Sequence, residues 1–273
     1  MTIRHLLDIT DLTVGELRHV LALSTAAPKK VLDGEGVALI FEKPSNRTRH
    51  SMEMAVVQLG GHPIYTRGEE VGFDVREPVE DITRVMAGYH AVLAARVFEH
   101  SVVARMAAVS PVPVVNMLSD LSHPLQALAD VLAMEEVHGS LAGHRVAFVG
   151  DWNNVSRSLA EACVMLGAEV SLGCPHGYDV SDDELVRLGS LGSGSVVQTD
   201  DVYAAVAGAT AVHTDTWTSM GREAEKAERA KIFADYSVTA AVMAHARPDA
   251  GFYRSEEHTS ELQSRQYLVC RLL

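Results

Sequence analysis

The 273-residue sequence is short of cysteine, of aromatic residues and of positive charge. Its three cysteines, Cys163, Cys174 and Cys270, form neither a metal-binding spacing nor an even disulfide framework, which favours a reducing cytoplasm. The chain has 23 lysines and arginines against 36 acidic residues, and its formal charge is -13. This acidic balance excludes a general nucleic-acid-binding surface.

The sequence also lacks the roughly 18 consecutive apolar residues that a membrane-spanning helix needs. Its first residues, Met1-Thr2-Ile3-Arg4-His5, do not form a signal-peptide pattern. With 47% hydrophobic and 22% charged residues, the composition is that of a globular protein with no membrane partner. The length suits two domains of ordinary size.

Strand and helix patterns alternate along most of the chain, which predicts an α/β fold. We expect two domains, each with a central, mainly parallel sheet flanked by helices. The boundary is expected near residues 138–143, where polar residues and glycines interrupt the pattern. The expected strands are 37–41, 62–66, 91–95, 112–116, 145–150, 169–172 and 211–214. The expected helices are 13–24, 48–59, 79–88, 102–109, 120–137 and 156–166, and residues 67–78 are expected to form a mobile loop.

The turn Ser45-Asn46-Arg47-Thr48-Arg49 lies between an apolar strand and a helix. The first N–H groups of a helix and its dipole favour an anion, and arginine suits phosphate geometry. We therefore predict a pocket for one small phosphorylated molecule. The alternative is a capped helix with two solvated arginines.

Further polar residues follow other expected strands, where ligands of open α/β sheets bind. Arg96 follows 91–95, His123 and Gln126 come shortly after 112–116, and Asp215 follows 211–214. The segment 150–154 holds the place of a dinucleotide-binding loop but lacks its glycines. Taken singly, these residues could equally be a surface arginine, a packed histidine or the cap of a helix.

Five stretches together resemble the aspartate/ornithine carbamoyltransferase family, and within it the ornithine branch. They occur in order, with family-like spacing, between Thr2 and about Tyr253. The stretches are Phe41-Glu42-Lys43-Pro44-Ser45-Asn46-Arg47-Thr48-Arg49, Leu59-Gly60-Gly61-His62-Pro63, His123-Pro124-Leu125-Gln126, Gly150-Asp151-Trp152-Asn153-Asn154 and Asp215-Thr216-Trp217-Thr218-Ser219-Met220-Gly221.

The resemblance implies two substrates, carbamoyl phosphate and L-ornithine, bound by residues 1–138 and 139–253 respectively. It implies that the phosphate is held by Ser45, Asn46, Arg47 and Thr48. It implies that Arg96, His123 and Gln126 bind the carbamoyl end and are catalytic. It implies that ornithine is held by Asn154, Asp215, Ser219 and Met220.

The implied reaction needs no metal and no organic cofactor. The neutral δ-amine of ornithine attacks the carbamoyl carbon, while Arg96 and His123 stabilise the charge that develops on the carbonyl oxygen. Arg47 and the helix N-terminus stabilise the departing phosphate. Proximity between two domains and closure that excludes water are further expectations, as is a homotrimer with shared sites.

The chain departs from the family pattern at two internal positions. Asn46 stands where the family usually has threonine, which also hydrogen-bonds phosphate. Glu70 lies in the loop from which family members reach into a neighbour's site. A carboxylate near phosphate is unfavourable unless Arg67 or Arg76 pairs with it, so this contact is expected only if one of these arginines forms that pair.

The last residues, 254–273, match the in-frame translation of a common short-read sequencing adapter. We therefore expect them to be non-native and the natural chain to continue beyond Tyr253. The family's His-Cys-Leu-Pro turn, a later substrate-binding arginine and a final helix are missing from the sequence as written. We expect residues 1–273 to be inactive or nearly so, and normal citrulline production would contradict this expectation.

Two alternatives stay open from the sequence. One is a carbamoyltransferase for another amine, such as putrescine or an acylated ornithine. The other is a non-catalytic anion-binding paralogue that keeps only the phosphate pocket.

Overall fold

The structure is a computed structural model that describes residues 3–217 and 225–254. The chain divides between Leu125 and Gln126 into two compact units, each built on its own parallel sheet. This confirms the predicted fold class. No helix within the described residues is both long and apolar enough to cross a membrane.

The first unit has a four-stranded sheet in the order β2-β1-β3-β4, with all neighbours parallel. Its strands are β1 (Gly36–Phe41), β2 (His62–Arg67), β3 (Val92–Arg96) and β4 (Val114–Leu118). Its helices are η1 (Ile9–Asp11), α1 (Val14–Ser24), α2 (Asn46–Gln58), α3 (Gly68–Val71), α4 (Val79–Ala87) and α5 (His100–Val109).

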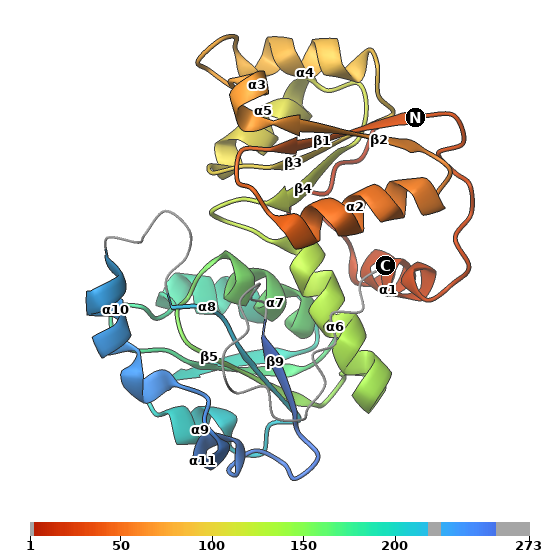
Figure 1. Cartoon of the computed structure of the whole chain (residues 1–273). Helices are drawn as coiled ribbons and strands as arrows, with labels where there is room; N and C mark the ends of the chain where they lie inside the picture. The colour runs from red at the N-terminus through yellow and green to blue at the C-terminus, as the bar shows by residue number, and fades with distance from the viewer. Residues whose placement is uncertain (1–2, 218–224, 255–273) are drawn as a thin grey trace. The chain divides into compact units, whose positions relative to one another are not determined.

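Strand β1 is buried on both faces, as a run of apolar residues predicts for a central parallel strand. Because side chains alternate along a strand, Ala38 and Ile40 pack with α4 and α5, whereas Leu39 packs toward α2. Figure 1 shows α4 and α5 on one face of this sheet and α2 on the other. The sheet therefore has an apolar core on each side.

The second unit has a five-stranded parallel sheet in the order β7-β6-β5-β8-β9. Its strands are β5 (Arg145–Val149), β6 (Glu169–Gly173), β7 (Ser195–Thr199), β8 (Ala211–Thr214) and β9 (Gly251–Arg254). Its helices are α6 (Pro124–His138, which begins just before the division), α7 (Asn154–Met165), α8 (Asp182–Gly189), α9 (Val202–Val206), α10 (Lys226–Ile232), η3 (Ala234–Tyr236) and α11 (Ala240–Met243).

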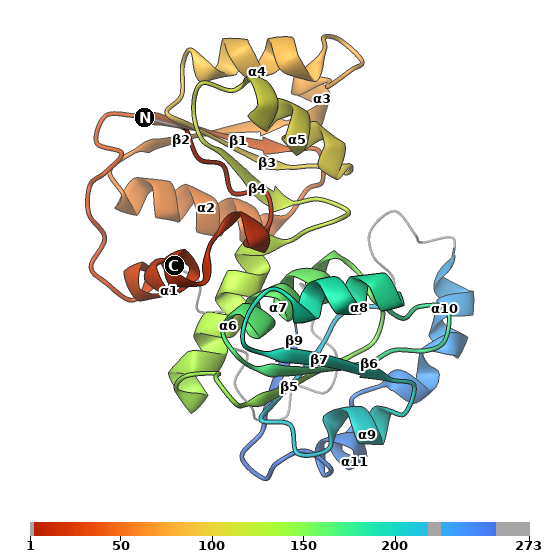
Figure 2. The same cartoon turned by 180° about the vertical axis from the view of Figure 1, so that it is seen from behind.

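The two faces of the second sheet are covered by different helices. Ala147 and Val149 of β5 pack with α9 and α11 in one cluster. Helix α7 is almost entirely buried on the opposite side, and Figure 2 shows α7 and α8 there. Phe148, the residue between Ala147 and Val149, points to that opposite face.

Residues 67–78 differ from the expected loop because they contain the short helix α3. The Glu70 carboxylate accepts the backbone N–H of Arg67 at the start of this turn, and Gly72 ends it at a φ of 62°. Arg76 donates to the backbone carbonyl of Glu70, not to its carboxylate. Four residues are too few for a helical period to show in the sequence, which explains the wrong prediction.

Strand β4 begins two residues later than predicted, at Val114, after Pro111 and Pro113. The segment 182–254 holds helices and strands that the sequence analysis did not predict, including β7 and the edge strand β9. The other predicted strands and helices overlap observed elements.

Candidate functional site

Strands β1 and β3 lie side by side in the first sheet. Between them, the side on which the chain adds its next strand changes. From β1 the chain passes through α2 to β2 on one side, and β3 then returns to the other side of β1. Phe41 and Arg96 are register partners at the carboxyl ends of these strands. Open α/β sheets bind ligands at such a reversal.

The predicted anion turn leads from β1 into α2, which begins at Asn46. Ser45 is the N-cap of α2, and its side chain accepts the backbone N–H of Thr48 at 3.4 Å. The Ser45 hydroxyl also donates to Oγ1 of Thr48 at 3.0 Å. Asn46 and Arg47 are the exposed first residues of the helix. Ser45 to Thr48 thus line the end of a helix that favours negative charge.

Arg96 joins this turn from β3, 48 residues further along the chain. Its side chain is buried, with 6% of the residue exposed, and its Nη1 donates to Oγ1 of Thr48 at 3.4 Å. Lys43 lies nearby, with its Nζ 4.9 Å from the Phe98 ring centroid. Burial, and the positive charge of Arg96, lower the pKa of Lys43. Positive charge is therefore concentrated here, which favours an anionic ligand.

His123 lies between β4 and α6, directly before the first residue of α6. Burial and the charge of Arg96 lower the pKa of His123 to about 3. The imidazole is thus neutral at physiological pH, and it can donate one N–H without carrying charge.

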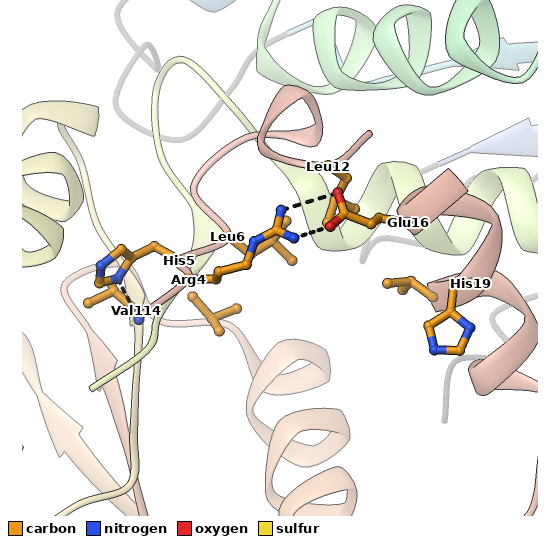
Figure 3. A pocket seen from close by; sticks show the side chains of 9 residues that line it. Arg4, His5, Leu6, Leu12, Glu16, His19 and Val114 are labelled. Carbon is orange, nitrogen blue, oxygen red and sulfur yellow. Dashed lines mark hydrogen bonds and ion pairs between the residues drawn. The ribbon is translucent and has the colours of Figure 1, made fainter. Parts of the chain in front are cut away.

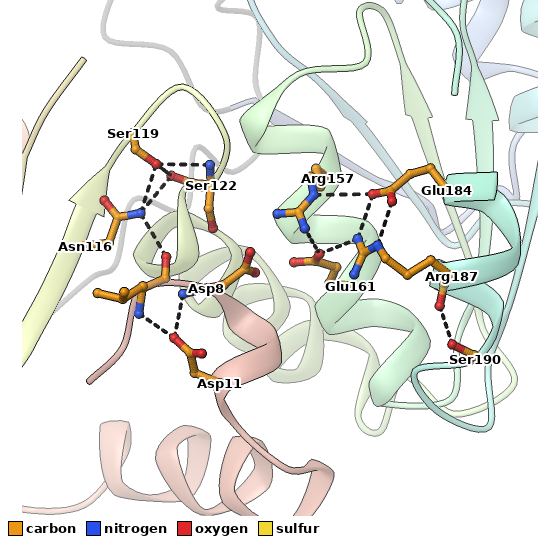
Figure 4. Close-up of polar contacts among 11 residues, drawn as sticks. Asp8, Asp11, Asn116, Ser119, Ser122, Arg157, Glu161, Glu184, Arg187 and Ser190 are labelled. Carbon is orange, nitrogen blue, oxygen red and sulfur yellow. Dashed lines mark hydrogen bonds and ion pairs between the residues drawn. The ribbon is translucent and has the colours of Figure 1, made fainter. Parts of the chain in front are cut away.

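The loop before His123 is held by a buried polar network, which Figure 4 shows. Asn116 of β4 donates through Nδ2 to Oγ of Ser119 at 3.2 Å and to the carbonyl of Ser122 at 3.3 Å. The backbone N–H of Ser119 donates to the same Ser122 carbonyl at 2.9 Å. These contacts fix the turn from which His123 emerges.

The second sheet has a matching reversal between β5 and β8. Val149 and Thr214 are register partners there, and the Thr214 hydroxyl donates to the Val149 carbonyl at 2.7 Å. Asn153 caps α7 and donates through Nδ2 to Oδ2 of Asp215 at 3.1 Å. Asn154 is the first residue of α7. The structure thus places Asn154 and Asp215 at one edge of this sheet.

Arg229 of α10 is a residue that the sequence analysis missed. It is buried, forms an ion pair with Asp151 and donates through Nε to the carbonyl of Trp217. Its guanidinium lies over the rings of Tyr178 and Phe233, at 4.9 and 5.2 Å from the centroids. Arg229 therefore ties the loop after β5 to the loop after β8. Nothing in its sequence neighbourhood distinguishes it from an exposed helical arginine.

Gln126 lies in the first turn of α6 and donates through Nε2 to Oδ1 of Asp130 at 2.9 Å. The other two predicted ornithine-binding residues, Ser219 and Met220, lie outside the described residues.

A separate pocket of about 350 Å³ lies in the first unit beside α1 and β4. Figure 3 shows the ion pair between Arg4 and Glu16, two of the residues that line it. Hydrogen bonds from Arg4 and from Thr13 lower the pKa of Glu16 to about 2. None of the predicted site residues lines this pocket.

Two family models match the chain. Residues 4–136 match the carbamoyl-phosphate-binding domain of aspartate/ornithine carbamoyltransferase, and residues 142–255 match its aspartate/ornithine-binding domain.

Individual relatives agree with the family match. An ornithine carbamoyltransferase of Thermus thermophilus is 41% identical over 269 residues, which span 94% of this chain and 87% of the relative. One of Bacillus subtilis is 39% identical over 272 residues, covering 95% and 85% of the two chains. The solved structure of ornithine carbamoyltransferase from Pyrococcus furiosus aligns with a TM-score of 0.87 at 38% identity, covering 92% of this chain and 84% of that one. With both domain models matched in order, the chain belongs to the aspartate/ornithine carbamoyltransferase family.

Proposed function

We propose that this protein transfers the carbamoyl group of carbamoyl phosphate to the δ-amine of L-ornithine, giving L-citrulline and phosphate. The observation that carries the proposal is the junction of the α2 N-terminus with Arg96 at the ends of β1 and β3. Family membership and the names of the relatives support the choice of substrates.

The phosphate is proposed to bind at the first turn of α2, through Ser45, Asn46, Arg47 and Thr48. Backbone N–H groups at a helix N-terminus and a guanidinium fork suit phosphate oxygens. The hydrogen bond from Arg96 to Thr48 supports placing the carbamoyl end on the Arg96 side of this turn.

Arg96 and His123 are proposed to stabilise the negative charge that develops on the carbonyl oxygen. Because the pKa of His123 is about 3, it acts as a neutral hydrogen-bond donor and not as a general acid at neutral pH. Arg96 supplies the charge from a buried position, where water weakens it little.

In the transfer step the δ-nitrogen of ornithine forms a bond to the carbamoyl carbon, and the bond from that carbon to the phosphate oxygen breaks. The leaving phosphate accepts a proton from the amine. Only the neutral amine has the electron pair that attacks. Because an alkylamine has an ordinary pKa of about 10.4, most of the δ-amine is protonated at neutral pH and must lose that proton before it attacks.

The α-ammonium group of ornithine is proposed to bind the Asp215 carboxylate, which the amide of Asn153 orients. Asn154 is proposed to hydrogen-bond the amino acid, together with Ser219 and Met220. A free ammonium suits Asp215, whereas an acylated nitrogen does not offer that group. Putrescine keeps the ammonium and lacks only the α-carboxylate of ornithine, so a comparison of binding separates these two amines.

Three finer assignments belong to the same proposal. They are the division of substrate binding between residues 1–138 and 139–253, a homotrimer and a cytoplasmic location. Light scattering tests the trimer, since three chains of 29.5 kDa have a mass of about 88 kDa (3 × 29.5). Cell fractionation with an antibody against the chain tests the location.

The function is tested first by binding, because binding separates the alternatives without requiring turnover. Calorimetry with carbamoyl phosphate, followed by L-ornithine, putrescine or Nα-acetylornithine, separates the alternatives. Tighter binding of L-ornithine than of either competitor supports the proposal. Binding of carbamoyl phosphate with no heat from any amine supports the anion-binding paralogue, and no binding of carbamoyl phosphate contradicts both.

A further inference from the structure

Asp130 is a buried carboxylate in the second unit, with 8% of the residue exposed. Its Oδ1 accepts a hydrogen bond from Nε2 of Gln126 at 2.9 Å, and its Oδ2 lies 2.9 Å from Nε2 of His213. A buried carboxylate is unfavourable unless it is hydrogen-bonded, and here both oxygens have a partner. Asp130 thus connects α6 to β8.

The His213 side of this contact is rigid. His213 is fully buried on β8, which lies between β5 and the edge strand β9, and its ring stacks on Phe148 at 5.7 Å between centroids and 19° between planes. Its other ring nitrogen, Nδ1, has no hydrogen-bond partner among the described residues. Because a carboxylate only accepts, the Nε2 of His213 carries the hydrogen and donates to Asp130.

The Gln126 side of the contact sets the orientation of an amide. Gln126 and Asp130 are four residues apart on α6 and so lie on one face of the helix. An acceptor at Asp130 holds the NH₂ group of the Gln126 amide toward itself. The carbonyl oxygen of that amide, Oε1, is then directed away from Asp130 and is left to accept a hydrogen bond.

A carbamoyl group carries an NH₂ donor, whereas an acetyl group has a methyl group of similar size in its place. We infer that Asp130 and His213 are positioning residues that present Gln126 as an acceptor, and so select a carbamoyl group over an acyl group. This inference rests on the proposed role of Gln126 in binding carbamoyl phosphate. It adds a source of substrate selectivity outside the residues that touch the substrate.

The test uses phosphonoacetamide and acetonylphosphonate, two stable phosphonates that differ only in NH₂ against CH₃. Their dissociation constants, and that of inorganic phosphate, are measured by calorimetry with the full 273-residue chain. We expect the wild type to prefer phosphonoacetamide by about threefold to tenfold, the worth of one neutral hydrogen bond. Q126L has no amide at this position, so its ratio of the two dissociation constants is the reference for complete loss of the preference.

Four variants separate positioning from general damage. We expect D130N, which leaves one oxygen for two donors, and H213F, which keeps an aromatic ring but loses the donor, to reduce the preference to below about twofold. We expect H213Q, which keeps an N–H donor, to restore much of it. E136Q, a carboxylate-to-amide change at an exposed position of α6, is the matched control and should keep the wild-type ratio.

The affinity for inorganic phosphate should change less than twofold in every variant, since phosphate carries no NH₂ group. Thermal unfolding establishes that each variant is folded at the temperature of the titration, and D130N carries the test if H213F does not fold. A wild-type preference retained in D130N and in folded H213F would overturn the inference. A wild-type chain that binds neither phosphonate would contradict the proposed function instead.

Discussion

Replacing Arg96 by glutamine removes a buried positive charge from the carboxyl end of β3. The guanidinium donates to Thr48 at the start of α2, and its charge helps to lower the pKa of His123 and that of Lys43. We therefore expect R96Q to weaken anion binding and also to raise the pKa of both neighbours.

The expected loss of affinity follows from the kind of contact. A hydrogen bond to a charged partner contributes about 1.5–3 kcal/mol. At about 1.4 kcal/mol for each factor of ten, the dissociation constant for phosphonoacetamide should rise by about 10-fold to 150-fold. The pKa of His123 should rise above about 3 but stay below 6.5, because burial, its largest cause, is unchanged.

Calorimetry measures the affinity, and the NMR signal of the His123 ring measures its pKa. R96K is the informative companion, because it keeps the charge but lacks the planar fork. It should leave the pKa of His123 close to the wild-type value and still weaken binding. R84Q, which removes an exposed arginine of α4, is the control. An R96Q affinity within twofold of the wild type, or an unchanged His123 pKa, would refute the assignment of Arg96.

Three further predictions concern single contacts. S45A removes the N-cap that accepts the N–H of Thr48, and it should lower the free energy of unfolding by about 1 kcal/mol in urea denaturation; an unchanged midpoint would contradict the capping role. N153A removes the hydrogen bond from Asn153 to the Asp215 carboxylate and should weaken L-ornithine binding while leaving phosphonoacetamide binding unchanged, and equal weakening of both would show general damage. The folded-state pKa of His123 is about 3, below its unfolded value of about 6.5. Between these pH values the unfolded chain binds more protons than the folded chain. The free energy of unfolding therefore decreases as the pH falls from about 6.5 toward 3. H123Q should make this loss shallower by at most about 1.4 kcal/mol per pH unit, and a parallel pH profile would contradict the low pKa.

The first unit was largely predictable because its signals are local. The Thr13 cap with Glu16 three residues later marks the start of α1, and the structure has both hydrogen bonds of that capping box. The apolar run of β1 likewise identifies a central strand. A turn of polar residues after such a strand falls at the carboxyl edge of the sheet, which is why Ser45 and Thr48 could be placed from sequence.

The contacts that organise the candidate site could not be predicted, because they join distant residues. Arg229 reaches Asp151 across 78 positions, and His213 reaches Asp130 across 83. In the sequence, neither residue differs from an ordinary helical arginine or strand histidine. Their burial and partners depend on how α6 and α10 pack, and no local period encodes that packing.

The proposed transfer is tested most directly with ¹³C-labelled carbamoyl phosphate and L-ornithine, followed by mass spectrometry of labelled citrulline. For residues 1–273 we predict a low rate that exceeds the protein-free rate, requires L-ornithine and is lost in R96Q. A rate equal to the protein-free rate, in a chain that binds carbamoyl phosphate but gives no heat with L-ornithine, would contradict the transferase and favour an anion-binding protein.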